Sequence, residues 1–396
     1  MRKTTFALAG LLPAILICAA QEQPARRPNN YRPTARGAAP APRLISPEVH
    51  ADRRITFRFR AAKASEVTLA FGAWNPKPQT LTKDAEGVWS LTVGPVEPEI
   101  YTYAFYVDGV RVLDLANPQL KTGSRGLDAS EVEVPGNPPR FDEVQDVPHG
   151  TIQIHTYRST PLKRLRGLYV YMPPEYAKEP KRRFPVLYLR HGGGDTEANW
   201  SDDGRAGVIL ENLLAQRKAA PMLIVMTNGD TDNTWAGGSS AEGMDLLGKE
   251  LLGDVVPLIE RSYRVLPGRE NRAIAGLSMG GGQAFTIGLR NLDSFAWVAE
   301  FSSGLVSDAD FDVAKHLPGF LTDPDAANRK LRLLYLSCGA DDPRMNGQLN
   351  LADLMRSHKI RLEFVSTPGG HEWKVWRHLL ADLLVRLFQP ASTAKT

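Results

Sequence analysis

The chain has 396 residues, of which 42% are hydrophobic and 23% charged, and its formal net charge is +4 at pH 7. This length and composition fit a folded protein of about two domains and exclude a fibrous or disordered chain. The first 43 residues hold seven Lys or Arg against one acidic residue. The rest of the chain is therefore slightly acidic, and no nucleic-acid partner is indicated.

The N-terminus predicts a secretory signal peptide over residues 1–20. A basic start at residues 2 and 3 precedes an apolar run over 6–18, and small residues end at Ala20. The run is short for a bilayer span, and Pro13 interrupts it. We expect cleavage near Ala20, a secreted or periplasmic bacterial protein, and no membrane attachment after cleavage. An uncleaved anchor is the alternative.

Three segments of different composition follow the signal peptide. Residues 21–42 are rich in Pro, Arg and small residues without an apolar period, which predicts a disordered linker. Over 43–135, alternating stretches such as ITFRFRA and EVTLAFG are separated by turn signals. This pattern predicts a small immunoglobulin-like β-sandwich. A second linker is expected over 136–150.

Residues 151–390 show another rhythm, in which apolar strand-like runs alternate with helical stretches. The strand-like runs include GLYVYMP, FPVLYL, PMLIVM, RAIAG, WVAEF, LRLLYLSCG and RLEFVS. Strands buried on both faces read as continuous apolar runs, so this alternation predicts a mostly parallel sheet with helices on both faces. The predicted fold class is α/β, preceded by the small all-β sandwich.

The only G-x-S-x-G of the chain is formed by Gly276, Ser278 and Gly280. It lies between the short strand RAIA and the helical stretch MGGGQAFTIGL, which is the position of a nucleophile elbow. The helix start supplies unpaired N–H groups, among them that of Met279, to face a developing oxyanion. This context predicts that Ser278 is a nucleophile; the alternative is a tight turn with a solvated serine.

A serine nucleophile needs a base and a group that orients the base. His371 follows a buried strand in the loop STPGGH, and Asp341 and Asp342 follow the preceding strand in CGADD. Both loops would lie at the carboxyl ends of parallel strands, where open α/β sheets place their sites. We expect His371 as base and Asp342 as its partner, with Asp341 as the alternative. The other histidines after Ser278 lie in helical or irregular stretches: His316, His358 and His378.

The glycine-rich turn in LRHGGGDTEANW follows the strand FPVLYL and offers a second oxyanion donor. We expect the N–H of Gly193 to act with that of Met279, with Gly192 as the alternative donor and His191 in a structural role. The sequence has no Cys/His cluster typical of a metal site, so no metal or cofactor is expected.

The catalytic half resembles carbohydrate esterase family 1, which includes feruloyl esterase domains of bacterial xylanases, acetylxylan esterases and the esterase D and enterochelin esterase types. The stretches that carry the resemblance are HGGGDTEANW, ELLGDVVPLIERSYRVLPGRENRAIAGLSMGGGQAF, CGADD and GGHEWKVW. The resemblance implies an α/β-hydrolase fold over most of 151–388. It also implies the triad roles for Ser278, Asp342 and His371, because the last Asp of CGADD matches the family's acid.

The N-terminal sandwich resembles the early-set domains grouped with family 48 carbohydrate-binding modules. Trp74 matches the first of two glycan-binding tryptophans, but Ala104 stands where a lysine is expected. Arg111 and Val112 stand where the second tryptophan belongs. We therefore expect a structural or site-shaping role rather than starch binding.

Three tryptophans are candidate substrate contacts, because rigid aromatic walls suit a sugar ring or a phenolic acyl group. They are Trp200, Trp235 and Trp373. Trp235, in the glycine-rich stretch NTWAGGSS, is the first choice, and Trp200 has the alternative role of bracing its loop.

These observations predict a secreted serine carboxyl-ester hydrolase that releases ferulate or a related hydroxycinnamate from plant cell-wall arabinoxylan. The expected partner is that polysaccharide ester or a small phenolic ester. Acetylxylan deacetylation is the near alternative, and a siderophore esterase is a distant one because no basic cluster is evident. A non-catalytic glycan-binding protein is the alternative from another class.

Overall fold

The computed structural model describes residues 43–72, 77–232, 234, 237–306, 308 and 311–389. The predicted signal peptide and first linker lie outside these ranges. Among the described residues, no helix has the length and apolarity needed to cross a membrane.

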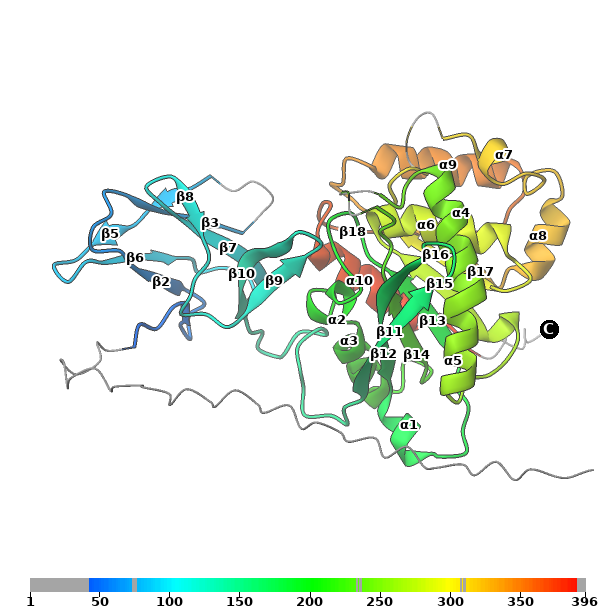
Figure 1. The fold of residues 1–396 in the computed structure, drawn as a ribbon, viewed down its shortest axis with the longest axis horizontal. Coiled ribbons are helices and arrows are strands. Elements are labelled where there is room, and N and C mark those ends of the chain that lie inside the picture. Colours follow the sequence, from blue (N-terminus) through cyan, green and yellow to red (C-terminus); the bar gives the residue numbers. More distant parts are fainter. Residues whose placement is uncertain are drawn as a thin grey trace, which may run out of the picture. The chain divides into compact units, whose positions relative to one another are not determined.

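The N-terminal region is a β-sandwich of two antiparallel sheets (Figure 1). One sheet has the order β1-β2-β6-β5, and the other has the order β4-β3-β7-β10-β9, with β8 beside β7. The strands are β1 (Glu48–Val49), β2 (Ile55–Arg60), β3 (Val67–Phe71), β4 (Gln79–Thr80), β5 (Thr82–Lys83), β6 (Val88–Val93), β7 (Glu99–Val107), β8 (Val110–Val112), β9 (Leu120–Gly123) and β10 (Gly126–Val134).

The core of the sandwich is made by alternate residues of strands from both sheets. Ile55 and Phe57 of β2 pack with Leu69 of β3 and Phe105 of β7, and all four side chains are fully buried. Successive side chains of a strand point to opposite faces, so this alternation is the one that the sequence pattern predicted.

Residues 151–389 form an eight-stranded sheet with the order β11-β12-β14-β13-β15-β16-β17-β18. The first two strands are antiparallel to their neighbours, and the strands from β14 to β18 are parallel. The strands are β11 (Thr151–Ser159), β12 (Arg164–Met172), β13 (Val186–Arg190), β14 (Leu223–Thr227), β15 (Arg272–Gly276), β16 (Trp297–Phe301), β17 (Leu333–Gly339) and β18 (Glu363–Thr367).

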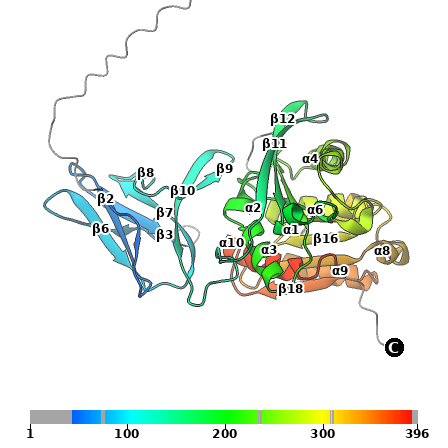
Figure 2. The same ribbon diagram turned by 90° about the horizontal axis from the view of Figure 1, so that it is seen from below.

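Helices lie on both sides of this sheet (Figure 1, Figure 2). They are α1 (Pro174–Lys178), α2 (Asn199–Asp202), α3 (Ala206–Ala215), α4 (Ala241–Glu250), α5 (Val256–Ser262), α6 (Ser278–Arg290), α7 (Val313–His316), α8 (Pro324–Lys330), α9 (Met345–Ser357) and α10 (Trp373–Leu384). A π-helical turn over Leu251–Val255 joins α4 to α5, and a 3-10 turn over Arg269–Asn271 precedes β15.

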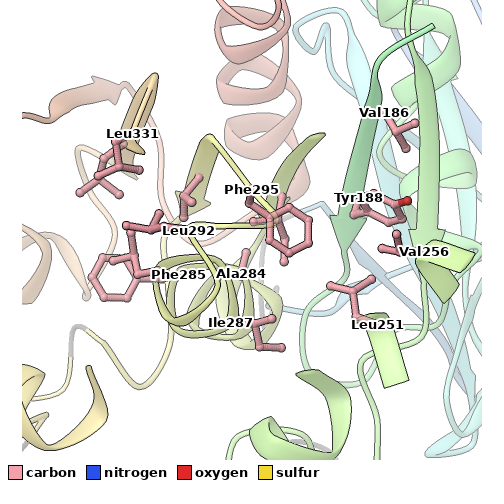
Figure 3. Packing of buried hydrophobic residues seen from close by; sticks show 14 of the residues in the cluster. Val186, Tyr188, Leu251, Val256, Ala284, Phe285, Ile287, Leu292, Phe295 and Leu331 are labelled. Atoms are coloured by element: carbon pink, nitrogen blue, oxygen red, sulfur yellow. The ribbon is translucent and has the colours of Figure 1, made fainter. Parts of the chain in front are cut away.

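Strand β13 contributes to a separate hydrophobic cluster on each face of the sheet. Val186 and Tyr188 pack with residues of α4, α5, α6 and α9, as Figure 3 shows for part of that cluster. Leu187 and Leu189 pack with residues of α3 and α10 on the other face. A strand with apolar side chains on both faces needs helices on both sides of the sheet to bury them. The structure has helices on both sides, which confirms the predicted α/β class.

The predicted second linker, 136–150, contains neither helix nor strand, yet hydrogen bonds fix it along its length. Arg140 donates to the carbonyl oxygen of Val134 at 2.7 Å. The Asn212 amide on α3 donates to the carbonyl oxygens of Phe141 and Glu143 at 2.9 and 2.8 Å. This segment is therefore part of the packed structure.

Candidate active site

Ser278 lies on the sharp turn between β15 and α6. Its φ of 49° is unusual for a residue other than glycine and is typical of a nucleophile elbow. A methyl group at Gly280 would overlap the carbonyl oxygen of His191, so the first turn of α6 can approach the end of β13 only with glycine there. The turn is also held by the segment after β16, because the Gly304 N–H donates to the Ser278 carbonyl oxygen at 2.8 Å.

His371, in the loop after β18, joins Ser278 to Asp342. Its Nε2 lies 3.0 Å from Ser278 Oγ, and its Nδ1 lies 2.8 Å from Asp342 Oδ2. Asp341, the alternative acid, instead accepts the main-chain N–H of Gly369 at 3.3 Å. The structure therefore brings together the three side chains that the sequence selected.

The remaining candidate histidines lie elsewhere. His316 stacks on Phe311 at 4.7 Å between ring centroids, and His378 packs against Phe141 at 4.4 Å. His358 is the C-cap residue of α9.

Asp342 is buried beside the imidazole, with 4% of its surface exposed. Burial alone would raise the pKa of this carboxyl. The hydrogen bonds from His371 and from the Arg344 N–H at 2.9 Å outweigh burial, and the pKa is lowered. Asp342 is therefore ionised at neutral pH and accepts the Nδ1 proton, which leaves the Nε2 lone pair directed at Ser278.

Glu300 of β16 is a second buried carboxyl beside the site, which the sequence analysis did not single out. One oxygen accepts the Ser303 N–H at 3.0 Å and the Gln348 amide at 3.2 Å; the other accepts the Ser337 N–H at 3.2 Å. Complete burial raises its pKa to about 8, and the charge of Asp342 adds to this. Glu300 is therefore mostly protonated at neutral pH. Its signal in the sequence is a lone acid within the apolar run WVAEF.

The loop after β13 runs close to the nucleophile. A methyl group at Gly192 would lie 3.4 Å from the Cβ of Ser278. His191 Nε2 accepts the Gly229 N–H at 2.8 Å, so its Nδ1 carries the proton and donates to the Gly192 carbonyl oxygen at 2.8 Å. Burial lowers the pKa of His191 to about 4, which keeps the ring neutral.

The orientation of the Gly193 N–H follows from that bond. A peptide group is planar and trans, so the Gly192 carbonyl and the Gly193 N–H point in opposite directions. His191 thereby fixes the predicted donor through the carbonyl of the same peptide. The Met279 N–H belongs to the first turn of α6, where N–H groups have no acceptor within the helix.

Trp200 corrects one of the predicted substrate contacts. Its ring is 1% exposed, its Nε1 donates to the Arg190 carbonyl oxygen at 2.8 Å, and it packs edge-on against Phe301 and Trp373. No face of the ring is open to a ligand, because α2 turns this side chain under the loop. Trp373 is partly exposed and also packs against Trp376 at 5.4 Å. Trp235 and Trp74 lie outside the described residues.

Comparison with known proteins places this fold and site in a family. The sequence model of an esterase family described as "Putative esterase" matches residues 159–387. The endo-1,4-beta-xylanase/feruloyl esterase of Xylanibacter ruminicola is 30% identical over 349 residues, which cover 87% of this chain and 46% of that protein. The chain spans about half or less of the length of three curated relatives that it matches.

Solved structures of esterases are also similar to this chain. A ferulic acid esterase is 26% identical with a TM-score of 0.51, and the match covers 60% of this chain and 97% of the other. The enterobactin esterase of Shigella flexneri has a TM-score of 0.61 at 18% identity, over 85% of this chain and 94% of its own. At that identity the likeness shows the fold alone. An 85% match is longer than residues 151–396, so the shared fold extends into the sandwich.

The fold is therefore that of the α/β-hydrolases. The chain belongs to the esterase family whose sequence model it matches.

Glu300 generates a prediction for the pH dependence of stability. Its pKa is raised in the folded state, so folding retains a proton that the unfolded chain releases above its ordinary pKa of 4.5. The free energy of unfolding should therefore fall as pH rises from about 4.5 to 8. In Glu300→Gln this fall should shrink by an amount on the order of a few kcal/mol over that range. Urea unfolding at pH 5, 6.5 and 8 measures it, and parallel curves for the two proteins would contradict it.

Trp200 generates a prediction that separates packing from binding. Trp200→Phe removes the donor to the Arg190 carbonyl oxygen and should lower the free energy of unfolding by about 1–3 kcal/mol. KM for a small ester should stay within about twofold, because the ring is buried. An unchanged melting temperature together with a KM several times higher would restore Trp200 as a substrate contact.

Proposed function

We propose that the protein cleaves esters through an acyl-enzyme on Ser278. The observation that carries this proposal is the continuous hydrogen-bonded chain from Ser278 Oγ through His371 to Asp342, at 3.0 and 2.8 Å. In this proposal His371 takes the Ser278 proton as the oxygen attacks the ester carbonyl, and Asp342 stabilises the imidazolium that forms.

The remaining steps use the same groups. The N–H groups of Met279 and Gly193 would hold the tetrahedral oxyanion. His371 then gives its proton to the leaving alcohol, and a water molecule deprotonated by His371 releases the acid from Ser278. Each step needs only side chains and main-chain groups of this chain, so the proposal includes no metal or cofactor.

The proposed substrate is a hydroxycinnamate ester of plant cell-wall arabinoxylan or a small phenolic ester. The names of two similar proteins support this proposal, because one is a xylanase/feruloyl esterase and the other is a ferulic acid esterase. Acetylxylan is the alternative substrate. We further propose that the protein is secreted or periplasmic, in keeping with the apolar N-terminal segment and its basic start.

Variants at the hydrogen-bonded chain test the mechanism. Ser278→Ala should lower kcat by about 10⁴-fold or more, and Asp342→Asn should lower it by a similar order because the imidazole loses the acceptor that fixes its tautomer. Asp341→Asn is the matched control and should keep kcat within about twofold, since the Asp341 carboxylate accepts the Gly369 N–H while Asp342 accepts the bond from His371. Hydrolysis of p-nitrophenyl acetate gives the readout, and equal losses in the two Asn variants would refute the assignment of the acid.

Substrate choice is tested with wild type on methyl ferulate and acetylated xylan. We expect kcat/KM for methyl ferulate to exceed that for p-nitrophenyl acetate, and ferulate to appear from feruloylated arabinoxylan. Release of acetate from acetylated xylan without ferulate release would favour the alternative. Absence of turnover on every ester would favour a glycan-binding protein, which a xylan pull-down would then examine.

A further inference from the structure

We propose that the turn between β9 and β10 of the sandwich positions the oxyanion loop, which we define as residues 192–195. Gly123 and Ser124 are the residues of the turn that make this contact. The inference rests on the proposed role of the Gly193 N–H. It makes the N-terminal sandwich a working part of the catalytic site rather than a detachable module.

The first observation is a main-chain bond between the two regions. The Ser124 N–H donates to the Gly194 carbonyl oxygen at 2.8 Å. Gly193 thus lies between two anchored carbonyls, that of Gly192 held by His191 and that of Gly194 held by Ser124. The bond to the Gly192 carbonyl orients the peptide that carries the Gly193 N–H. The bond from Ser124 holds the peptide after Gly194, so the oxyanion loop is anchored on both sides of Gly193.

The second observation is the closeness of the two main chains. A methyl group at Gly123 would lie 2.7 Å from the Gly194 carbonyl oxygen, which no pair of carbon and oxygen atoms tolerates. Glycine is therefore needed at this strand end for the bond from Ser124 to form. The approach is steric and involves main-chain atoms, so rotation of a side chain cannot relieve it.

The third observation is a polar network that ties the same turn to α2. The Asn199 amide donates to the Thr122 carbonyl oxygen at 2.7 Å and to the Asp203 carboxylate. The Asn199 side-chain oxygen accepts the Thr196 N–H at 2.6 Å, so one buried side chain joins β9 to the segment that follows the oxyanion loop.

Charge adds to this network from β9. Burial opposes the charge of Lys121, but Asp195 and Asp203 outweigh burial and raise its pKa. Burial raises the pKa of Asp195 to about 7, and Lys121 opposes that rise. The charge of Lys121 on the sandwich therefore favours the ionised form of Asp195 in the oxyanion loop.

A matched pair of variants at one position tests the main-chain bond. Ser124→Pro removes the N–H donor, and proline is accepted at the first corner of a two-residue turn, where Ser124 stands between the paired Gly123 and Gly126. Ser124→Ala keeps the N–H and is the control, because the exposed Ser124 side chain makes no hydrogen bond to the described residues. Gly123→Ala perturbs the same contact by steric overlap, without removing a donor.

The full chain is assayed with p-nitrophenyl acetate, and with an aryl trifluoromethyl ketone, which accepts the serine oxygen and places an oxyanion in the site. We expect Ser124→Pro and Gly123→Ala to lower kcat about tenfold, with KM within about twofold. The inhibition constant of the ketone should rise in the same proportion as kcat/KM falls. Ser124→Ala should match wild type.

The outcomes separate the inference from the proposed function. The inference is overturned if Ser124→Pro and Gly123→Ala both keep kcat and ketone affinity within twofold of the alanine control, or if Ser124→Ala loses as much as Ser124→Pro. Should Ser124→Pro fail to fold, Gly123→Ala decides alone by the same two readouts. Activity that persists in Ser278→Ala would instead remove the proposed function.

Discussion

The close approach of two neighbouring parallel strands governs the whole site. Strands β13 and β15 pair so that Arg190 lies beside Gly276, and the two strands therefore end at the same edge of the sheet. The loop after β13 must then pass over the turn that carries Ser278, and glycine at position 280 makes room for it. The nucleophile and the loop with the proposed oxyanion donor are therefore placed by one sheet register.

The balance between burial and hydrogen-bond donors decides the charge of each acid around this turn. Asp342 and Glu300 are both buried acids near the nucleophile, but their pKa values shift in opposite directions. Asp342 has an imidazole partner and a main-chain donor, whereas complete burial dominates at Glu300. One carboxyl can thus remain charged to orient His371 while the other stays protonated and braces the strand ends behind it.

The sandwich takes part in this arrangement because it contacts the oxyanion loop and other segments of the catalytic region. Besides the turn at Ser124, Arg205 pairs with Glu133 of β10 at 3.2 Å, and Arg377 of α10 pairs with Glu99 of β7. Arg377 also pairs with Asp142 of the connecting segment at 2.7 Å. The Arg377 pairs are buried, and removing one partner of a buried ion pair is costly because the other charge is left without compensation.

Local signals in the sequence were enough for the fold class and for the choice of Ser278. Strand and helix periods, and the glycine spacing around the serine, are properties of a few adjacent residues, and the backbone follows them directly. The order of loops after parallel strands also selected His371 and the CGADD acids. The sequence by itself therefore determined which residues could meet.

Tertiary structure decided which of them do meet and which side chains are hidden. Asp342 rather than Asp341 faces the imidazole because of how the CGADD turn is rotated, and Trp200 is buried because α2 folds it under its own loop. The contact of Ser124 with Gly194 joins residues seventy positions apart through main-chain atoms, so no pattern of side chains in the sequence predicts it. Long-range packing and main-chain hydrogen bonds leave no local trace in a sequence, and they set the final geometry of the site.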